Sequence, residues 1–392
     1  MRAVVIVIVV AFHSVLPYLA SQPAQPYPFD AAPYRWIAFP ILDRDRWFGF
    51  DLFCAWQDVS LMSLMFFLAG LFTPASLARK GTLPYLLERA RRIGLPFLLA
   101  VGILSPLAYF ASFRTTAADP SLEAFWQHWQ ALPMWPSGPA WFLWQILLLG
   151  AVAAALVFFF PGSRSRLGNI THALHDRPLA FCLVLTALSL LAYAPLAMIF
   201  GPWDWTFLGP FSFQLSRPLH YSLYFLAGFA LGCTPAEKGL LHPEGPLARK
   251  WLLWLAAAIA TFMLWGGFTS LTMPNWNDSP YAARFAAALA FPIACATGLF
   301  GFLAVCLRLF TMRHPALDAL SENAYSIYLV HYVPVVWLQY ALLGSELPVL
   351  AKAATVLACG LAASWAAAAA SLRLLRHGFE LTARRAVPNH LR

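Results

Sequence analysis

A series of apolar stretches, each about as long as a membrane-spanning helix, extends along this 392-residue chain. A helix that crosses the hydrocarbon core of a bilayer needs about 20 predominantly apolar residues. The stretches therefore predict an all-α fold, a polytopic integral membrane bundle of about ten transmembrane helices. The predicted spans are residues 2–20, 52–74, 93–113, 140–160, 179–200, 218–233, 250–268, 285–307, 323–343 and 347–372.

The composition excludes a soluble protein. Hydrophobic residues make up 60% of the chain and charged residues only 11%, whereas soluble domains carry about 25% charged residues. The mean hydropathy is +0.65. The net charge of +9 does not indicate nucleic-acid binding, because the basic residues lie in short runs between apolar stretches. The six cysteines show no CxxC spacing, so we expect packing thiols and no metal site.

We expect one transmembrane domain over residues 1–372, followed by a basic cytoplasmic tail over 373–392. The first span has an alternative interpretation as a cleaved signal peptide, but no pair of small residues suited to cleavage follows it at Ala20–Ser21. With the N-terminus in the cytoplasm, 19 of the 26 lysines and arginines lie on the inner side, as the positive-inside rule requires. This predicts a multi-pass protein of the inner (cytoplasmic) membrane with both termini in the cytoplasm. The remaining basic residues, on the predicted outer side, are Arg35, Arg44, Arg46, Arg114, Arg217, Arg284 and Lys352.

The tryptophans are distributed unevenly in this topology. Thirteen lie towards the outer side, and only Trp251, Trp254 and Trp365 lie towards the cytoplasm. An aromatic belt would occupy both interfaces. The asymmetry favours an outer face that presents aromatic rings to a ligand such as a sugar, although longer outer loops would also collect tryptophan.

Two histidines are predicted at the same membrane depth. His13 lies eleven residues after Arg2, about 16 Å along a helix axis, and His331 lies about 14 Å into the ninth predicted span. Titratable groups at this depth are costly and often functional. The pair could face a common cavity and take a proton from a hydroxyl group. The alternative is that each ring only hydrogen-bonds a neighbouring helix.

Other charged residues add candidates for ligand binding. Asp58, inside the second span, could orient an imidazole or bind an acceptor hydroxyl, or it could be the structural partner of a serine or arginine. Arg89 and Arg92, with Arg91 between them, are three residues apart and would share one face of an α-helix. Arginine forks suit phosphate oxygens, although any inner loop collects arginine. The chain has no Walker A loop, GxSxG elbow or HExxH motif.

Five stretches in order resemble the membrane acyltransferase 3 family, and within it the glucan biosynthesis protein C-like branch. The resemblance extends over residues 2–345. Ala69 stands where many relatives have serine, so a hydroxyl role there is lost. Relatives usually have a short leader before the position of Arg2, so either the natural start lies upstream of Met1 or Arg2 is weakly anchored. The stretches are Arg2-x10-His13, Phe66-Phe67-Leu68-Ala69-Gly70, Arg89-x-x-Arg92 with Ile93-Gly94-Leu95-Pro96, Gly138-Pro139-Ala140-Trp141-Phe142-Leu143, and Ala324 to His331.

The resemblance implies transfer of an acyl group from cytoplasmic acyl-CoA, a substrate rather than a bound cofactor, to a hydroxyl of an acceptor at the outer face. Arg89, Arg91 and Arg92 would hold the coenzyme A phosphates. His13 would be the general base or carry the acyl group, with Arg2 near the thioester or phosphates and His331 as a second polar group. The residues expected to receive a saccharide or glycan are Asp58, Trp141, Trp203, Asp204 and Trp205, with Asp43, Asp45 and Trp276 in the same outer loops.

Several alternatives stay open at this stage. A transporter or flippase for a saccharide or lipid-linked sugar would also place polar groups in the membrane, but such proteins commonly contain internal repeats, and none is visible here. Succinyl and acetyl groups are both compatible with the chain. The branch resemblance favours succinylation of a periplasmic glucan, while another polysaccharide, a lipid-linked sugar or a small molecule is also possible as acceptor. The sequence does not indicate an oligomeric state.

Overall fold

The chain divides into two compact units, each assembled from separate segments. Unit 1 comprises residues 1–51, 102–132 and 313–392, and unit 2 comprises residues 52–101 and 133–312. The computed structural model describes residues 2–234, 239–273, 275–310 and 314–385. The predicted single domain over residues 1–372 stays a prediction. Of the predicted tail, the backbone is described as far as Arg385, and the predicted inner-side residues Lys238, Arg313 and Arg392 lie outside the described residues.

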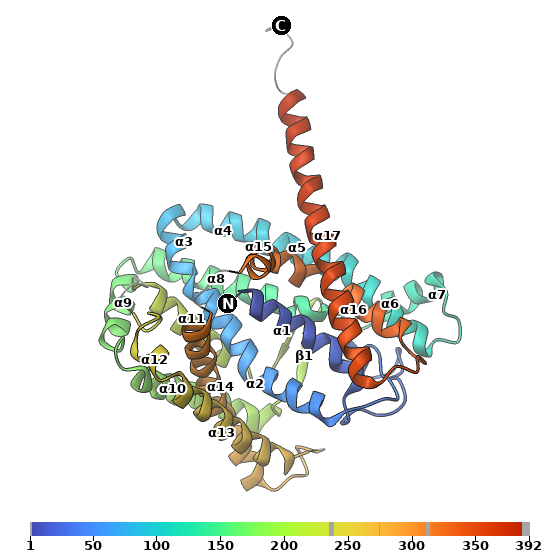
Figure 1. The fold of residues 1–392 in the computed structure, drawn as a ribbon, viewed down its shortest axis with the longest axis horizontal. Coiled ribbons are helices and arrows are strands. Elements are labelled where there is room, and N and C mark those ends of the chain that lie inside the picture. Colours follow the sequence, from blue (N-terminus) through green and yellow to red (C-terminus); the bar gives the residue numbers. More distant parts are fainter. Residues whose placement is uncertain (1, 235–238, 274, 311–313, 386–392) are drawn as a thin grey trace. The chain divides into compact units, whose positions relative to one another are not determined.

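Unit 1 is built around its first helix. Helix α1 packs against α15, α16 and α17, and α16 also packs against α6. Figure 1 shows α1 in dark blue beside α16 and α17 in orange and red. The apolar residues of α1 include the buried Ile6, Val9 and Val10, which account for this packing. The elements of unit 1 are α1 (Arg2–Val15), η1 (Leu16–Tyr18), η2 (Arg35–Ile37), α6 (Ser105–Thr116), α7 (Leu122–Ala131), α15 (Pro315–Val330), α16 (Tyr332–Ala341) and α17 (Val349–Arg385).

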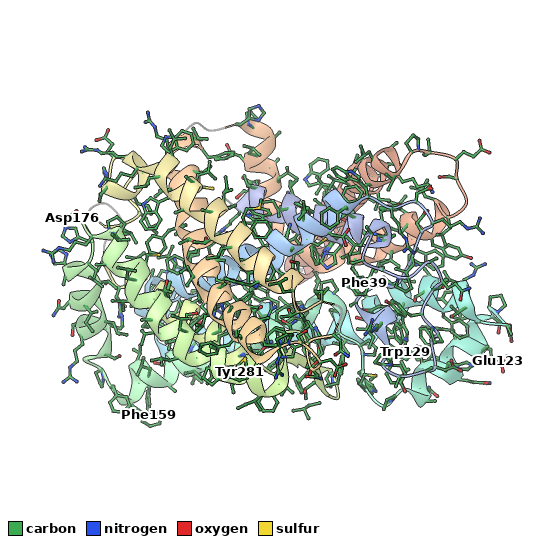
Figure 2. The ribbon with its side chains drawn as sticks, turned by 90° about the horizontal axis from the view of Figure 1, so that it is seen from below. Phe39, Glu123, Trp129, Phe159, Asp176 and Tyr281 are labelled. Atoms are coloured by element: carbon green, nitrogen blue, oxygen red, sulfur yellow. The ribbon has the colours of Figure 1, made fainter. Side chains whose placement is uncertain are left out.

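An aromatic core connects the long loop after η1 with the helices of unit 1. The ring of Phe29 stacks on Trp36 at 4.1 Å, and Trp36 meets Tyr109 edge to face at 5.1 Å. Trp129 is buried on α7 and lies towards the body of the unit, whereas Glu123 on the same helix lies at its edge (Figure 2). Aromatic pairs of this geometry stabilise a core beyond their buried area. The loop is therefore fixed by packing although it contains little regular structure.

Unit 2 is also almost entirely helical. Helix α14 packs against α13 and α10, and Figure 1 shows α13 alongside α14. A small antiparallel hairpin, which the sequence analysis did not predict, pairs Trp205 with Gln214 and Leu208 with Phe211. The elements of unit 2 are α2 (Phe48–Leu71, beginning in unit 1), α3 (Thr73–Lys80), α4 (Thr82–Arg89), η3 (Ala90–Gly94), α5 (Leu95–Leu99), η4 (Ala100–Leu104, continuing into unit 1), η5 (Gly138–Ala140), α8 (Trp141–Phe159), α9 (Ser163–Ala173), α10 (Pro178–Phe200), β1 (Trp205–Leu208), β2 (Phe211–Gln214), α11 (Pro218–Gly232), α12 (Pro246–Arg249), α13 (Trp251–Ser270) and α14 (Tyr281–Leu309).

Close glycine contacts between α2 and α11 show why Gly70 stands in the Phe66–Gly70 stretch. A Cβ at Gly70 would lie 1.9 Å from the carbonyl oxygen of Phe225, and one at Gly228 would lie 2.0 Å from that of Phe67. Only glycine permits two helix backbones to approach this closely, as is common in membrane bundles. The stretch therefore has a packing role within unit 2.

Seven helices within the described residues are long and apolar enough to cross a membrane. The chain is about 75% helical, which confirms the predicted helical membrane fold at this coarse level. The helix over Arg2–Tyr18 is apolar but shorter, α11 has 15 residues, and the predicted span 323–343 is interrupted at His331. The number of spans and the side of the termini stay predictions. The seven are Phe48–Lys80, Thr82–Thr116, Gly138–Phe159, Pro178–Phe200, Trp251–Ser270, Tyr281–Leu309 and Val349–Ala370.

Large apolar side chains on the outside of these helices support the membrane assignment. In α13 only 11% of the most apolar 18-residue stretch is buried, and Leu252 and Leu253 are largely exposed. Phe159 at the end of α8 also lies at the edge of its unit (Figure 2). Exposed apolar surface of this extent is costly in water and favourable in lipid. The fold is that of a multi-pass membrane protein.

Candidate active site

The structure brings His13 and His331 into contact, although 318 residues separate them in the chain. His13 lies near the end of α1, and His331 lies between α15 and α16. His331 Nε2 is 3.2 Å from His13 Nδ1, and the ring centroids are 4.9 Å apart. The two imidazoles therefore meet within unit 1, and their common depth in the membrane stays a prediction. Their chemical roles stay predictions.

The helix interruption at His331 has a local cause. Pro334 has no N–H to donate to the carbonyl of Val330, so a continuous helix would lose a hydrogen bond there. At the junction, the His331 ring donates from Nδ1 to the carbonyl oxygen of Tyr328, at 2.7 Å. This hydrogen bond fixes the ring orientation and aims Nε2 at His13.

The hydrogen bonds also determine which ring nitrogens carry protons. His331 Nδ1 must carry a proton because its partner is a carbonyl, so Nε2 of the neutral ring is an acceptor. His13 Nδ1 lies 2.9 Å from the carbonyl oxygen of Val9, so it is also protonated and shares its N–H between Val9 and His331. His13 Nε2 is left with its lone pair, and no described residue hydrogen-bonds to it. This nitrogen is the available base of the pair.

Two further residues, both missed by sequence reasoning, hold His13 in place. The carbonyl of His13 has no helical donor because Pro17, four residues later, lacks an N–H. The buried side chain of Gln339 supplies it, since Nε2 donates to this carbonyl at 2.6 Å. The ring of Tyr332 meets His13 nearly edge-on at 5.3 Å. Pro17 was the sequence signal that a carbonyl near His13 needs a donor from another helix.

Arg2 is not brought to the histidine pair by the fold. It is exposed at the first turn of α1, eleven residues before His13. At 1.5 Å per residue, the two residues are separated by about 16 Å along the helix axis. Arg2 could meet a different part of a long substrate, but not the group that reacts at His13.

The predicted arginine cluster lies on a helix that is not α-helical throughout. Residues 90–94 form a turn of π-helix, so Arg89 and Arg92 do not follow the α-helical spacing on which their shared face was predicted. Arg89 lies over the Tyr85 ring at 5.2 Å and donates to Thr73 Oγ1 at 3.4 Å. Arg92 is 78% exposed and reaches Glu88 at 3.1 Å.

Cationic side chains outnumber carboxylates around this segment. Glu88 also pairs with Lys80, so one carboxylate serves two cations. Arg91 is exposed beside them. The three arginines 89, 91 and 92 therefore include at least two guanidinium groups that a phosphate could reach from solvent.

Asp58 has a clear partner in unit 2. Arg217 donates to both carboxylate oxygens, from Nη1 at 2.5 Å and from Nη2 at 2.7 Å, and also to the hydroxyl of Tyr221. Arg217 is buried, with 1% of its side chain exposed. Of the two predicted roles for Asp58, the structure provides the ion pair with an arginine.

The predicted acceptor residues are distributed over two neighbourhoods of unit 2. Trp141 begins α8, and its ring meets that of Trp205 on β1 at 5.3 Å. Trp203 instead meets Trp276 at 6.2 Å, and Asp204 is exposed between the two tryptophans of its segment. The structure thus groups Trp141 with Trp205, and Trp203 with Trp276.

Asp43 and Asp45 belong to unit 1, where both contact Lys352. The Nζ atom of Lys352 lies 3.1 Å from the Asp43 carboxylate and 2.7 Å from that of Asp45. Asp43 and Lys352 are buried, so this contact fastens the loop to α17 and leaves only Asp45 exposed to a ligand. All six cysteines are free thiols, and the described residues contain no group of three or more side chains suited to hold a metal ion.

A further histidine, which the sequence analysis did not single out, is buried in unit 2. Ser63 Oγ is 3.2 Å from His220 Nε2, and Ser189 Oγ is 2.6 Å from His220 Nδ1. All three side chains are buried. Because both ring nitrogens have partners, this histidine joins α2, α10 and α11 rather than offering a base.

The fold is that of a multi-pass membrane protein, and its unit 1 holds two histidines in contact. A family model described as an acyltransferase domain, that of the acyltransferase 3 family, matches residues 1–369. The chain therefore belongs to the acyltransferase 3 family, and it is an acyltransferase that transfers groups other than aminoacyl groups. A search of curated proteins and a search of solved structures each found no match.

Proposed function

We propose that the protein transfers an acetyl- or succinyl-type group from cytoplasmic acyl-CoA to a hydroxyl of an extracytoplasmic saccharide. One observation carries this proposal: no described residue hydrogen-bonds to Nε2 of His13. The Val9 carbonyl and the contact with His331 keep the proton of the neutral ring on Nδ1, so Nε2 can act as a base. Family membership supplies the reaction class. The proposal includes the inner membrane as location, about ten spans and both termini in the cytoplasm.

The proposed reaction involves His13 and the two substrates. The acceptor hydroxyl attacks the thioester carbonyl carbon while His13 Nε2 takes its proton. A C–O bond forms, the C–S bond breaks, and the imidazolium returns the proton to the departing thiolate of coenzyme A. General base catalysis of this kind contributes about 10²–10⁴-fold, and positioning contributes much of the rest.

His331 supports the protonated state of His13. When Nε2 accepts a proton, positive charge spreads over the ring and strengthens the hydrogen bonds that Nδ1 donates. The acceptors are the Val9 carbonyl and His331 Nε2. The same arrangement would also serve a His13 that carries the acyl group transiently, so it supports both proposed roles.

The arginine segment is proposed to bind the phosphates of coenzyme A. Arginine presents a planar fork to phosphate oxygens, and the segment retains more cations than carboxylates. Arg91 and Arg92 are exposed, whereas Arg89 is held by Tyr85 and Thr73. We expect Arg91 and Arg92 to make the direct contacts and Arg89 to fix the turn.

The transporter or flippase alternative receives no support from the family match, which is to an acyltransferase. The glucan biosynthesis protein C-like branch would specify succinyl transfer to a periplasmic glucan. Family membership fixes neither the donor nor the acceptor, so succinyl transfer to a periplasmic glucan belongs to the proposal.

The test uses purified protein in lipid bilayers with radiolabelled acetyl-CoA or succinyl-CoA and a periplasmic glycan extract. Wild type should move label into glycan, whereas His13→Ala should lose at least about 100-fold in rate. His128→Ala, an exposed histidine on α7, is the matched control and should behave as wild type. Normal turnover by His13→Ala would reject its assignment as the base.

The donor site is tested in the same preparation. Arg91→Ala with Arg92→Ala should raise the KM for acyl-CoA roughly tenfold or more, because two charge-assisted phosphate contacts are lost. An unchanged KM would remove the phosphate-binding role. If wild type consumes no donor while glycan binding is intact, the transporter hypothesis would take precedence.

A further inference from the structure

Two tyrosines of unit 1 form a short row between the long loop after η1 and His13. Tyr109 lies on α6, and Tyr332 is the first residue of α16. The hydroxyl of Tyr109 donates to the backbone carbonyl of Ile37 in the loop, at 2.7 Å. The two tyrosine rings meet edge to face with their centroids 5.7 Å apart, and their hydroxyl groups also interact with each other. The row therefore begins at the loop and ends at the ring that contacts His13.

The hydrogen bonds along this row have a defined direction. A carbonyl can only accept, so the single hydroxyl proton of Tyr109 is directed to Ile37. The oxygen of Tyr109 keeps its lone pairs, and the hydroxyl of Tyr332 is the donor that faces them. Tyr109 is fully buried and Tyr332 is 8% exposed. Because a buried hydroxyl is costly to leave unpaired, removing one member of the row also disturbs the other.

The loop end of the row is held by aromatic packing. The ring of Trp36, which precedes Ile37, meets Tyr109 edge to face at 5.1 Å. Its Nε1 donates to the carbonyl oxygen of Phe29 at 2.8 Å, and Trp36 is 1% exposed. Helices α6 and α16, which carry the two tyrosines, also pack against each other. The Ile37 carbonyl is therefore a fixed point from which Tyr109 is oriented.

At the other end of the row, Tyr332 restricts the imidazole of His13. The Val9 carbonyl and His331 both engage Nδ1, so these hydrogen bonds hold one edge of the ring. The ring of Tyr332 stands at 80° to the imidazole with 5.3 Å between centroids, and this contact limits its tilt. A displacement of about 1 Å at a reacting group can cost on the order of 10²-fold in rate. The placement of Tyr332 therefore bears on the position of Nε2.

We propose that Tyr109 is a positioning residue for acyl transfer. Its hydroxyl, anchored on the Ile37 carbonyl, holds Tyr332 in the orientation in which Tyr332 packs on His13. The inference rests on the proposed function, in which Nε2 of His13 is the base. It extends the site through α6 to the loop after η1, because a displaced loop would move the Ile37 carbonyl and, through the two tyrosines, the base.

Tyr109→Phe is the first test, because it removes the hydroxyl and keeps an aromatic ring against Trp36. The protein is assayed in lipid nanodiscs with radiolabelled acetyl-CoA or succinyl-CoA and a saturating periplasmic glycan extract. The kcat should fall roughly 5- to 20-fold, because the base is misplaced. The KM for acyl-CoA should stay within about twofold, since the tyrosines do not contact the donor in this role.

Tyr27→Phe is the matched control. Tyr27 lies in the same loop, and its hydroxyl donates to Gln22 Oε1 at 2.9 Å, so this variant also removes a hydrogen bond that a loop tyrosine makes. Its kcat should stay within about twofold of wild type, because the row to His13 is intact. Equal losses of kcat in Tyr27→Phe and Tyr109→Phe would show that the rate depends on loop packing in general, and the specific role of Tyr109 would be rejected.

Tyr332→Phe tests whether the two hydroxyls act together. Its loss of kcat should resemble that of Tyr109→Phe. The double variant should lose no more than about twofold beyond the larger single loss, because both substitutions break the same row. If the two losses instead multiply, the tyrosines act independently and the proposed row is wrong.

The outcomes separate this inference from the proposed function. Rates are expressed per folded enzyme, with thermal unfolding of each variant as the measure of folding. If wild type transfers acyl groups and Tyr109→Phe keeps its kcat, or loses rate only in proportion to its folded fraction, the positioning role is wrong and the function stands. If wild type transfers no acyl group to the extract, the proposed function fails and the inference fails with it.

Discussion

The two histidine sites of this protein, one in each unit, use the same side chain in opposite ways. In unit 1, His13 and His331 are linked through one nitrogen of each ring, and His13 Nε2 has no partner among the described residues. In unit 2, both nitrogens of His220 are hydrogen-bonded, one to Ser63 and one to Ser189. The hydrogen bonds of the ring nitrogens therefore distinguish the two sites.

The difference shows what a base inside a membrane protein requires. One ring nitrogen must be saturated to fix the tautomer and the ring orientation, while the other must keep its lone pair. His13 satisfies this condition because the Val9 carbonyl takes its N–H and Gln339 holds its backbone. His220 lacks a lone pair that is free of hydrogen bonds. Substitutions at the two sites should therefore affect different measurements.

The largest effect among the remaining substitutions is expected at His331. His331→Asn keeps a donor near the Tyr328 carbonyl but loses the acceptor that faces His13. The rate of acyl transfer should fall roughly 10- to 100-fold, because the base loses part of its positioning. His331→Gln, whose amide reaches further and can accept from His13 Nδ1, should recover part of the loss. Steady-state rates of both variants in bilayers provide the measurement.

The pattern of the two variants decides between positioning and packing. If the asparagine and glutamine variants lose activity equally and unfold at the same lower temperature, His331 contributes packing only. Recovery by glutamine without a change in unfolding temperature would place His331 in the orientation of His13.

His220→Leu should change stability rather than catalysis. It leaves the buried hydroxyls of Ser63 and Ser189 without this partner, which costs about 2–5 kcal/mol in total. The unfolding midpoint in detergent should fall, while the KM for acyl-CoA should be unchanged in the fraction that remains folded. Adding Ser63→Ala and Ser189→Ala should recover part of the stability, because no hydroxyl is then left unpaired. A selective loss of kcat with normal stability would contradict the structural role.

The smallest effect is expected at Gln339. Gln339→Leu removes the donor to the His13 carbonyl and should lower stability by about 1 kcal/mol, with a change in rate below about threefold. Pro17→Ala should reduce this loss in the double variant, because it restores an N–H four residues after His13. Unfolding midpoints of the single and double variants measure the coupling. No recovery in the double variant would show that the carbonyl finds another donor.

The membrane fold could be predicted from the sequence because lipid imposes a simple condition. A spanning segment must be apolar and must satisfy its own backbone hydrogen bonds, which favours helices of about 20 residues. Seven of the ten predicted spans coincide with such helices. The other three depart locally: the first helix, Arg2–Tyr18, is shorter, α11 is short, and the ninth predicted span is interrupted at the junction before Pro334.

The helical membrane class and the family could be inferred from the sequence alone, and the common depth of His13 and His331 is predicted from it. These follow from composition, from ordered motifs and from a constant rise per residue, all of which are local properties of the chain. The pairing of Asp58 with Arg217, the hydrogen bond from Gln339 to His13, and a pocket that Trp276 and Arg217 both line became visible only in the folded structure. Each of these depends on which residues of distant helices meet, and hydrogen-bond partners within about 3 Å cannot be read from spacing along one helix.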